Sequence, residues 1–317
     1  MFGRLVDKFT RSAILMYHRV AVVEHDPWGL SVSPENFALQ LKALRRRGPV
    51  LPLEEFASRL AAGTLPSRAT AISFDDGYHD NLAQAAPLLA AEGMVATLFL
   101  STGPSRAGRG YWFEDLAELI LDAPDAFDGR IGIGGHETSL HWGEREEADD
   151  NRAGWRAWDE PRTRREALFY QLWDLIRVLP PASQTATLET LAGLLARAPE
   201  REARPMTVEE VRAIAQGPFA IGGHTVDHVD LLTLDDAGAL DQMVRGREEA
   251  EAMSGARVKG FAYPYGRYDA RVADLAKRAG YDWACTTEHR HIGRRGAPLM
   301  LLPRLSPEDM GNIGWMR

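Results

Sequence analysis

Two short segments of the chain combine carboxylates and imidazoles at spacings that could bind a metal ion. In the first, Asp75 and Asp76 end an apolar run and precede Gly77, a residue suited to a tight turn. Adjacent residues of an extended chain point to opposite sides, so the carboxylates could take two roles, one on a metal and one on a water. Taken alone, Asp-Asp-Gly is more typical of an ordinary turn with side-chain hydrogen bonds.

The second segment carries two histidines, His224 and His228. Their four-residue spacing would place both imidazoles on one face of a helical turn. With an aspartate they form a plausible ligand set for zinc or a similar divalent ion. An isolated pair of this kind is more often two surface histidines, but its position after an apolar run and Gly222-Gly223 favours the metal site. Thr225 is predicted to hydrogen-bond within the network that orients one imidazole.

The elements that must position these residues alternate between short apolar runs and amphipathic helices. This alternation predicts a parallel sheet covered by helices, and seven strands suit a closed or nearly closed barrel, whose active site lies in the loops after the strands. Ser33, Asp80 and Thr207 are predicted to cap helices. The predicted strands are Ala13–Tyr17, Ala69–Phe74, Val95–Leu100, Phe219–Gly222, Gly260–Tyr263, Trp283–Thr287 and Leu299–Leu302.

The alternation of apolar runs and amphipathic helices is interrupted in the region from about 103 to 205. Its sequence pattern predicts three helices (Phe113–Ala123, Arg165–Leu179 and Ser183–Ala198) and a glycine-rich hairpin. The region contains five of the eight tryptophans. We expect a single domain over residues 1–317 with this largely helical insertion forming a cap over one end of the barrel. The tryptophans could stack on sugars, or they could form the core of the insertion.

Composition excludes several classes of protein. The chain has 317 residues, 45% hydrophobic and 26% charged, and a formal net charge of −8, which argues against a nucleic-acid partner. Cys285 is the one cysteine, so an internal disulfide and a four-cysteine zinc site are excluded, and we expect it to be inert packing. With no uncharged run of about 20 residues and no visible targeting segment, we expect no transmembrane segment and a cytoplasmic location.

Together these segments resemble the polysaccharide deacetylase family, also called the NodB-homology domain or carbohydrate esterase family 4. The family's Thr/Ser-Phe-Asp-Asp-Gly motif corresponds to residues 73–77, and its His-Thr/Ser-x-x-His motif to residues 224–228. A third motif is partly preserved as Phe-Ala-Tyr-Pro-Tyr-Gly at residues 261–266. The resemblance extends from roughly Ala13 to Arg304, and the joint match of three motifs at strand ends is specific.

This resemblance implies a distorted (β/α) barrel and a metal-dependent hydrolase that removes acetyl groups from sugars. By position, Asp76, His224 and His228 would bind one divalent ion, zinc in the first place, with cobalt or nickel as alternatives. Asp75 would be the general base. The backbone N–H of Tyr265 would help to bind the oxyanion.

Two features depart from the usual pattern of the family. Ala262 stands where an arginine usually holds the base, and Arg304 is the candidate substitute, with a surface ion pair as the alternative. The last strand also lacks the histidine that usually serves as general acid. His18, after the first strand, could replace it, because first and last strands are neighbours in a closed barrel; this resembles the permuted arrangement of poly-N-acetylglucosamine deacetylases. His289 and His291 are alternative acids.

The expected function is therefore a carbohydrate N-deacetylase, a hydrolase of non-peptide carbon–nitrogen bonds. Metal-activated water would attack the amide with an aspartate as base and a histidine as acid. The substrate would be an N-acylated amino sugar or glycan intermediate, either free or linked to a nucleotide or a lipid. The alternatives are an N-deformylase or small-amide hydrolase on the same barrel, and a glycan-binding barrel without turnover.

Overall fold

The computed structural model describes residues 11–123, 126–144, 154–200, 203–293 and 296–306. The chain divides into two compact units. The barrel unit comprises Met1–Val22, Leu30–Gly108 and Pro205–Arg317, and the inserted unit comprises Val23–Gly29 and Arg109–Arg204. The single domain with a cap, as expected from the sequence, stays a prediction.

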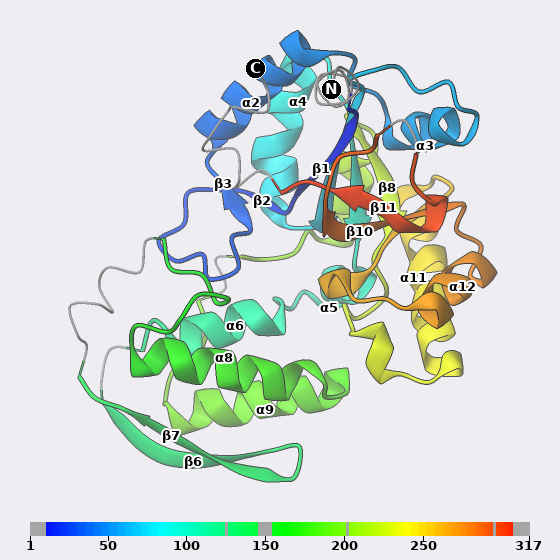
Figure 1. Cartoon of the computed structure of the whole chain (residues 1–317). Coiled ribbons are helices and arrows are strands. Elements are labelled where there is room, and N and C mark those ends of the chain that lie inside the picture. The colour runs from blue at the N-terminus through cyan, green and yellow to red at the C-terminus, as the bar shows by residue number, and fades with distance from the viewer. Residues whose placement is uncertain (1–10, 124–125, 145–153, 201–202, 294–295, 307–317) are drawn as a thin grey trace, which may run out of the picture. The chain divides into compact units, whose positions relative to one another are not determined.

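Seven parallel strands form the barrel unit, as the sequence predicts (Figure 1). In spatial order they are β1 (Ala13–Tyr17), β4 (Thr70–Asp76), β5 (Ala96–Leu100), β8 (Phe219–Gly223), β9 (Gly260–Ala262), β10 (Trp283–His289) and β11 (Leu302–Arg304). Leu305, directly after β11, exchanges backbone hydrogen bonds of 2.9 and 2.8 Å with Met16 and Ile14 of β1. These two bonds join the first strand to the last and close the ring, which confirms the distorted barrel.

Both faces of the strands are buried, as expected for a parallel sheet between two layers of packing. Alternate residues of β1 show this, because Leu15 and Tyr17 belong to the larger apolar cluster with Phe74. Ile14, which lies between Ala13 and Leu15 of that cluster, belongs to a second cluster with Phe99. All seven residues of β4 are buried, so the strand that ends at the two aspartates is rigidly held.

Helices cover the outside of the barrel, with α2 and α4 on one side in Figure 1 and α11 and α12 on another. Ser33 and Thr207 cap helices as predicted, each accepting a hydrogen bond from a backbone N–H in the first turn. The helices of this unit are α2 (Pro34–Arg47), α3 (Leu53–Ala61), α4 (Ala86–Ala91), α5 (Thr102–Ala107), α10 (Val208–Ile214), α11 (Asp236–Ser254) and α12 (Ala270–Arg278). Among the described residues, no helix is both long enough and apolar enough to cross a bilayer.

Short elements complete the barrel unit. They are the paired strands β2 (Arg19–Val20) and β3 (Ser31–Val32), the π-helix η1 (Asn81–Ala85), and the 3₁₀ turns η2 (Leu231–Thr233), η3 (Pro264–Gly266) and η4 (Leu299–Leu301). The last of these replaces most of the strand that was predicted at Leu299–Leu302, so β11 begins three residues later than expected.

The inserted unit contains the three helices and the hairpin expected from the sequence. These are α6 (Trp112–Ile120), α8 (Arg164–Arg177), α9 (Pro181–Leu194) and the antiparallel strands β6 (Phe127–Ile133) and β7 (His136–Trp142). Trp112, Trp142 and Trp155 are buried, so these three form part of the unit's own core. Trp158 is 61% exposed.

Candidate metal and catalytic site

The polar residues singled out in the sequence gather at the carboxyl ends of the barrel strands. In a parallel barrel these ends lie on one rim, where the loops after the strands meet. Residues from five strand ends are involved, and all belong to the barrel unit: His18 after β1, Asp75 and Asp76 at the end of β4, His224 and His228 after β8, Tyr265 after β9, and Arg304 at the end of β11.

The end of β4 is shaped by two successive residues with positive φ. Asp76 has a φ of 72° and Gly77 a φ of 100°, so the extended chain stops at Asp76. A Cβ on Gly77 would lie 2.6 Å from Cδ1 of Leu100, so only glycine fits this turn without a shift. Asp75 and Asp76 are both 2% exposed, so both carboxylates at this turn are buried.

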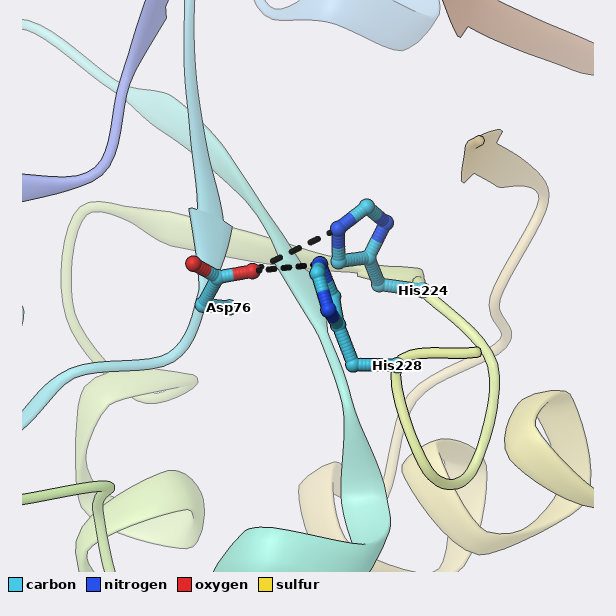
Figure 2. A group of neighbouring side chains, drawn as sticks. All are labelled: Asp76, His224 and His228. Atoms are coloured by element: carbon cyan, nitrogen blue, oxygen red, sulfur yellow. Dashed lines mark ion pairs between the residues drawn. The ribbon is translucent and has the colours of Figure 1, made fainter. Parts of the chain in front are cut away.

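Asp76, His224 and His228 come together as a buried three-ligand cluster (Figure 2). Asp76 Oδ1 lies 3.4 Å from His224 Nε2 and 3.3 Å from His228 Nε2, and the three donor atoms lie within 4.8 Å of one another. These separations exceed the roughly 2.7–3.2 Å of an N–H···O hydrogen bond. They match the edge of a tetrahedron around an ion about 2.0–2.1 Å from each donor. The donor set therefore fits a divalent ion such as zinc.

The two histidines are presented by an irregular loop and not by the helical turn expected from their spacing. Residues 224 to 230 form no helix, and Thr225 and His228 have positive φ values of 67° and 52°. The chain therefore folds back between them, which brings the rings to a centroid distance of 4.9 Å. Figure 2 shows both imidazoles pointing from this loop toward Asp76.

Helix α11 packs against this loop and forms hydrogen bonds with it. Gln242 Oε1 accepts hydrogen bonds from the backbone N–H groups of Val226 and Asp227, at 3.1 and 3.0 Å, and its Nε2 donates to Asp227 Oδ2 at 2.8 Å. Gly246, one turn further along, lets the helix approach closely, since a Cβ there would lie 2.7 Å from the carbonyl carbon of Thr225. The strained backbone of the loop is thus held by the α-helix that follows it in the chain.

His224 is oriented by the carbonyl of Ala262, 2.8 Å from its Nδ1. Because a carbonyl can only accept, Nδ1 carries a proton, and Nε2 is the nitrogen that faces Asp76. Ser101 Oγ donates to the backbone carbonyl of His224 at 2.8 Å. The hydrogen bond predicted for Thr225 is wrong, because its buried hydroxyl has no hydrogen-bond partner among the described residues. Sequence reasoning missed the role of the Ala262 carbonyl, since a backbone carbonyl leaves no signature in residue type.

The pKa values of the two histidines shift in opposite directions, because burial dominates at His228 and the neighbouring aspartates dominate at His224. Desolvation lowers the pKa of His228 to about 4, so its imidazole is neutral at neutral pH, as a metal ligand must be. Burial also acts to lower the pKa of His224, but its contact with Asp76 and the charge of Asp75 outweigh this and raise it. Burial acts to raise the pKa of Asp76, yet the histidines hold it below its ordinary value.

Arg304 holds Asp75 in a bidentate ion pair with both N···O distances at 2.7 Å. The arginine is fully buried, so the alternative of a surface ion pair is wrong. Its Nε donates to the carbonyl of Thr286 at 2.9 Å, and its Nη1 lies 3.2 Å from Ser73 Oγ. Burial acts to raise the pKa of Asp75, but the Arg304 charge holds it below its ordinary value, so the carboxylate is ionised at neutral pH.

His18 reaches the same rim from the first strand. Its Nε2 lies 3.8 Å from Asp75 Oδ2, and its side chain is 18% exposed. The closure of the barrel through β1 and β11 explains how residues near opposite ends of the chain meet at Asp75. Tyr265, with a φ of 57°, packs its ring against His228 at a centroid distance of 4.5 Å. The oxyanion role of its backbone N–H stays a prediction.

The remaining candidates are His289, His291 and Cys285. His289 is exposed at the end of β10, and His291 lies two residues beyond it. Cys285 is fully buried, and burial raises the pKa of its thiol to about 12, so it packs as an inert residue, as expected. Within the described part of the chain, Asp76, His224 and His228 are the one group of three or more His, Cys, Asp or Glu that could hold a metal ion.

Comparison with known proteins supports the resemblance seen in the motifs. The family model described as polysaccharide deacetylase matches residues 183–284. The Bacillus subtilis (strain 168) protein YxkH, named as a polysaccharide deacetylase, is 28% identical over 108 residues, which cover 34% of this chain and 39% of that protein. The matched segment thus spans well under half of either chain.

Two solved structures share the fold over nearly the whole chain. The Streptococcus pyogenes deacetylase PplD, in complex with acetate, has a TM-score of 0.59 at 18% identity, covering 97% of this chain and 98% of that one. IcaB from Ammonifex degensii has the same TM-score and identity and covers 97% of each chain. The named relatives are deacetylases, which agrees with the hydrolase class expected from the sequence. The chain is therefore similar in sequence to the polysaccharide deacetylases over residues 183–284, and it shares the fold of these two solved structures.

Proposed function

We propose that this chain is a metal-dependent hydrolase that removes the N-acetyl group from an amino sugar or glycan intermediate. One observation carries the proposal: three buried metal-ligand atoms lie within 4.8 Å of one another beside an ionised, arginine-bound aspartate. A ligand cluster and a separate base are what hydrolysis of an unactivated amide needs, because water must be both activated and deprotonated. The similarity to deacetylases supports this choice of reaction.

Asp76, His224 and His228 would hold the ion, and we propose zinc, with cobalt or nickel fitting the same nitrogen and oxygen donors. A divalent ion bound there would polarise the acyl oxygen and lower the pKa of a water from about 15.7 to about 7. The carbonyl of Ala262 supports the ligand geometry through His224. Such outer partners raise the basicity of an imidazole and fix its direction.

Asp75 would take the proton from the attacking water. Its pKa lies below the ordinary value, so the carboxylate is available as a base at neutral pH. Arg304 uses two of roughly four lone-pair sites on that carboxylate, which leaves others for a water. The bidentate pair also stops the carboxylate from rotating, so the base keeps one direction throughout turnover.

His18 would donate a proton to the departing amine. An amide nitrogen leaves poorly as an anion, so protonation has to accompany the collapse of the tetrahedral adduct. The imidazole is 3.8 Å from Asp75 and partly exposed, which places it where base and solvent meet. The backbone N–H of Tyr265 would stabilise the developing negative charge on the acyl oxygen. The cytoplasmic location and a nucleotide- or lipid-linked substrate stay predictions.

The test measures bound metal and acetate release together. Purified wild-type protein should carry about one divalent ion per chain and release acetate from N-acetylglucosamine oligomers, whereas the double variant His224→Ala, His228→Ala should lack both. The matched control replaces two exposed histidines of the hairpin, His136 and His141, by alanine and should behave as wild type. No metal in the wild type after addition of zinc, cobalt or nickel would sink the proposal. Activity on formyl sugars or small cyclic amides alone would show that the protein is an N-deformylase or a small-amide hydrolase instead.

A further inference from the structure

Residues shortly after Asp75 and Asp76 form hydrogen bonds to the segment that carries His18. Asp80, four residues after Asp76, was expected to cap the next helix, but within the described structure η1 receives no side-chain capping hydrogen bond. Its carboxylate turns instead to the segment after β1. Oδ1 accepts from the backbone N–H of Val20 at 3.0 Å, and Oδ2 accepts from Arg19 Nε at 3.1 Å.

Asn81 extends this set of hydrogen bonds one residue further. Its side chain is fully buried, and Nδ2 donates to the backbone carbonyl of His18 at 2.7 Å. The same nitrogen lies 3.2 Å from Asp80 Oδ1, so the two side chains brace each other. Three consecutive residues, His18 to Val20, are therefore each held by one of two adjacent side chains. Burying an amide N–H group is costly unless it is hydrogen-bonded, and the carbonyl of His18 satisfies this requirement for Nδ2. The Oδ1 atom of Asn81 is buried without a hydrogen-bond partner among the described residues.

The backbone at Asn81 is specialised for this position. Asn81 opens the π-helix η1, in which the N–H of Ala86 bonds to the carbonyl of Asn81 five residues earlier. Pro87 follows and cannot donate a hydrogen bond to the preceding turn, which favours the wider π turn. Single π turns of this kind occur often at functional sites.

The hydrogen bonds from Asp80 and Asn81 affect where the His18 imidazole lies relative to Asp75. His18 Nε2 lies 3.8 Å from Asp75 Oδ2, beyond hydrogen-bond distance, so this contact alone does not fix the ring. Its backbone is fixed by residues only five and six positions after Asp75. One short stretch, residues 75–81, therefore places the aspartate at its start and the histidine segment at its end. Pairing of β1 with β4, in which Tyr17 lies opposite Phe74, sets the two groups side by side, and these hydrogen bonds hold the segment after β1 in that place.

We propose that Asn81, braced by Asp80, is a positioning residue that sets the His18 imidazole against Asp75 and the leaving group. The inference rests on the proposed function in one respect, the role of His18 as proton donor. It adds that this role depends on a hydrogen bond to the His18 backbone. A misplacement of about 1 Å can cost roughly 10²-fold in rate, so the loss of this bond acts on turnover.

The decisive experiment compares two acetyl substrates in a double-mutant cycle. Asn81→Ala should lower kcat for an N-acetylglucosamine oligomer by about 10- to 100-fold, within the range of a general acid. Hydrolysis of 4-nitrophenyl acetate should fall by less than about threefold, because its leaving group needs no proton. In a His18→Ala background, Asn81→Ala should have no further effect on the amide, since both changes remove one function. Equal losses on both substrates, or additive losses in the cycle, would overturn the inference.

Controls separate this result from general damage and from failure of the proposed function. Ser254→Ala removes another buried side-chain bond to a backbone carbonyl, 2.7 Å long at the end of α11, and should leave the amide-to-ester ratio unchanged. If Asn81→Ala does not fold, Asp80→Asn weakens the brace without opening a cavity and should change the ratio in the same direction. Hydrogen exchange of the peptide covering residues 17–22 needs no turnover: faster exchange in Asn81→Ala supports this role of Asn81, and unchanged exchange refutes it. Loss of the proposed function would show separately, as activity retained in the His224→Ala, His228→Ala variant.

Discussion

Replacing Arg304 by methionine is expected to lower the free energy of unfolding by about 3–5 kcal/mol at pH 7, the usual cost of leaving one member of a buried ion pair unpaired. The guanidinium meets both oxygens of Asp75 at 2.7 Å, and the two side chains are 0% and 3% exposed. Burial thus removes the water that would otherwise solvate the remaining carboxylate. Loss of this much stability is a large share of the about 5–15 kcal/mol typical of a folded protein.

The size of the effect should depend on pH in a defined direction. In the wild type the pKa of Asp75 lies below its ordinary value, so the pair stabilises the fold above about pH 3.9 and this contribution is lost only in stronger acid. Without Arg304, burial dominates and the pKa of Asp75 should rise above its ordinary value. The folded variant then binds a proton more tightly than the unfolded chain. The deficit relative to wild type should therefore shrink as the pH falls from 7 toward 4.

Urea denaturation of both proteins at pH 7 and pH 5 tests this reasoning. Arg59→Met is the matched control, because Arg59 Nε also lies 2.7 Å from a carboxylate, that of Glu55, but the two side chains are 45% and 40% exposed. That exposed pair should contribute less than about 1 kcal/mol. The double variant Asp75→Asn, Arg304→Met should regain part of the loss. A cost below about 1 kcal/mol for Arg304→Met, or a cost that grows on acidification, would refute the argument.

Three further predictions concern the base, the cysteine and the supporting helix. Asp75→Asn should retain bound metal but lose about 10²–10⁴-fold in kcat, because only the base is removed; metal loss by elemental analysis would show that the roles of the two aspartates are exchanged. Cys285 should resist a thiol reagent at pH 8 in the native protein and react once per chain in denaturant, since burial raises its pKa to about 12; rapid native labelling would contradict this. Gly246→Ala should cost about 1–3 kcal/mol and weaken metal binding, because the new methyl group would meet the backbone of Thr225. Gly193→Ala, on an exposed position of α9 with nothing near its Cβ, should instead stabilise by up to about 1 kcal/mol in thermal denaturation.

Much of the fold follows from local patterns in the sequence. The first strand matches its predicted bounds, Ala13–Tyr17, and the strands that carry Asp75 and His224 were found to within two residues. Short apolar runs before polar residues are a strong signal in parallel barrels, because strands buried on both faces must be apolar until they reach the rim. The predicted caps Ser33 and Thr207 are confirmed, because helix capping depends on a hydrogen bond within a single turn and is therefore readable from local sequence.

Local spacing failed where distant partners decide the backbone. The four-residue interval between His224 and His228 suggested a helix, yet positive φ values make it a loop, held by Gln242 from α11. Asp80 has the residue type of a helix cap, but its carboxylate instead accepts a hydrogen bond from the backbone N–H of Val20, 60 positions earlier. In both cases a tertiary hydrogen bond replaces the local one that propensity favours.

The sequence by itself determined the chemical inventory of this protein: two aspartates after one strand, two histidines after another, and a helix-covered parallel barrel to present them. Only the tertiary structure decided which groups meet. Arg304 became the partner of Asp75 because ring closure brings β11 beside β1, and burial then removes the competing water. Pairing of β1 with β4, in which Tyr17 lies opposite Phe74, brings His18 within 3.8 Å of Asp75. Residue type sets what a side chain can do, but distance and dielectric, which set how strongly it acts, exist only once the chain has folded.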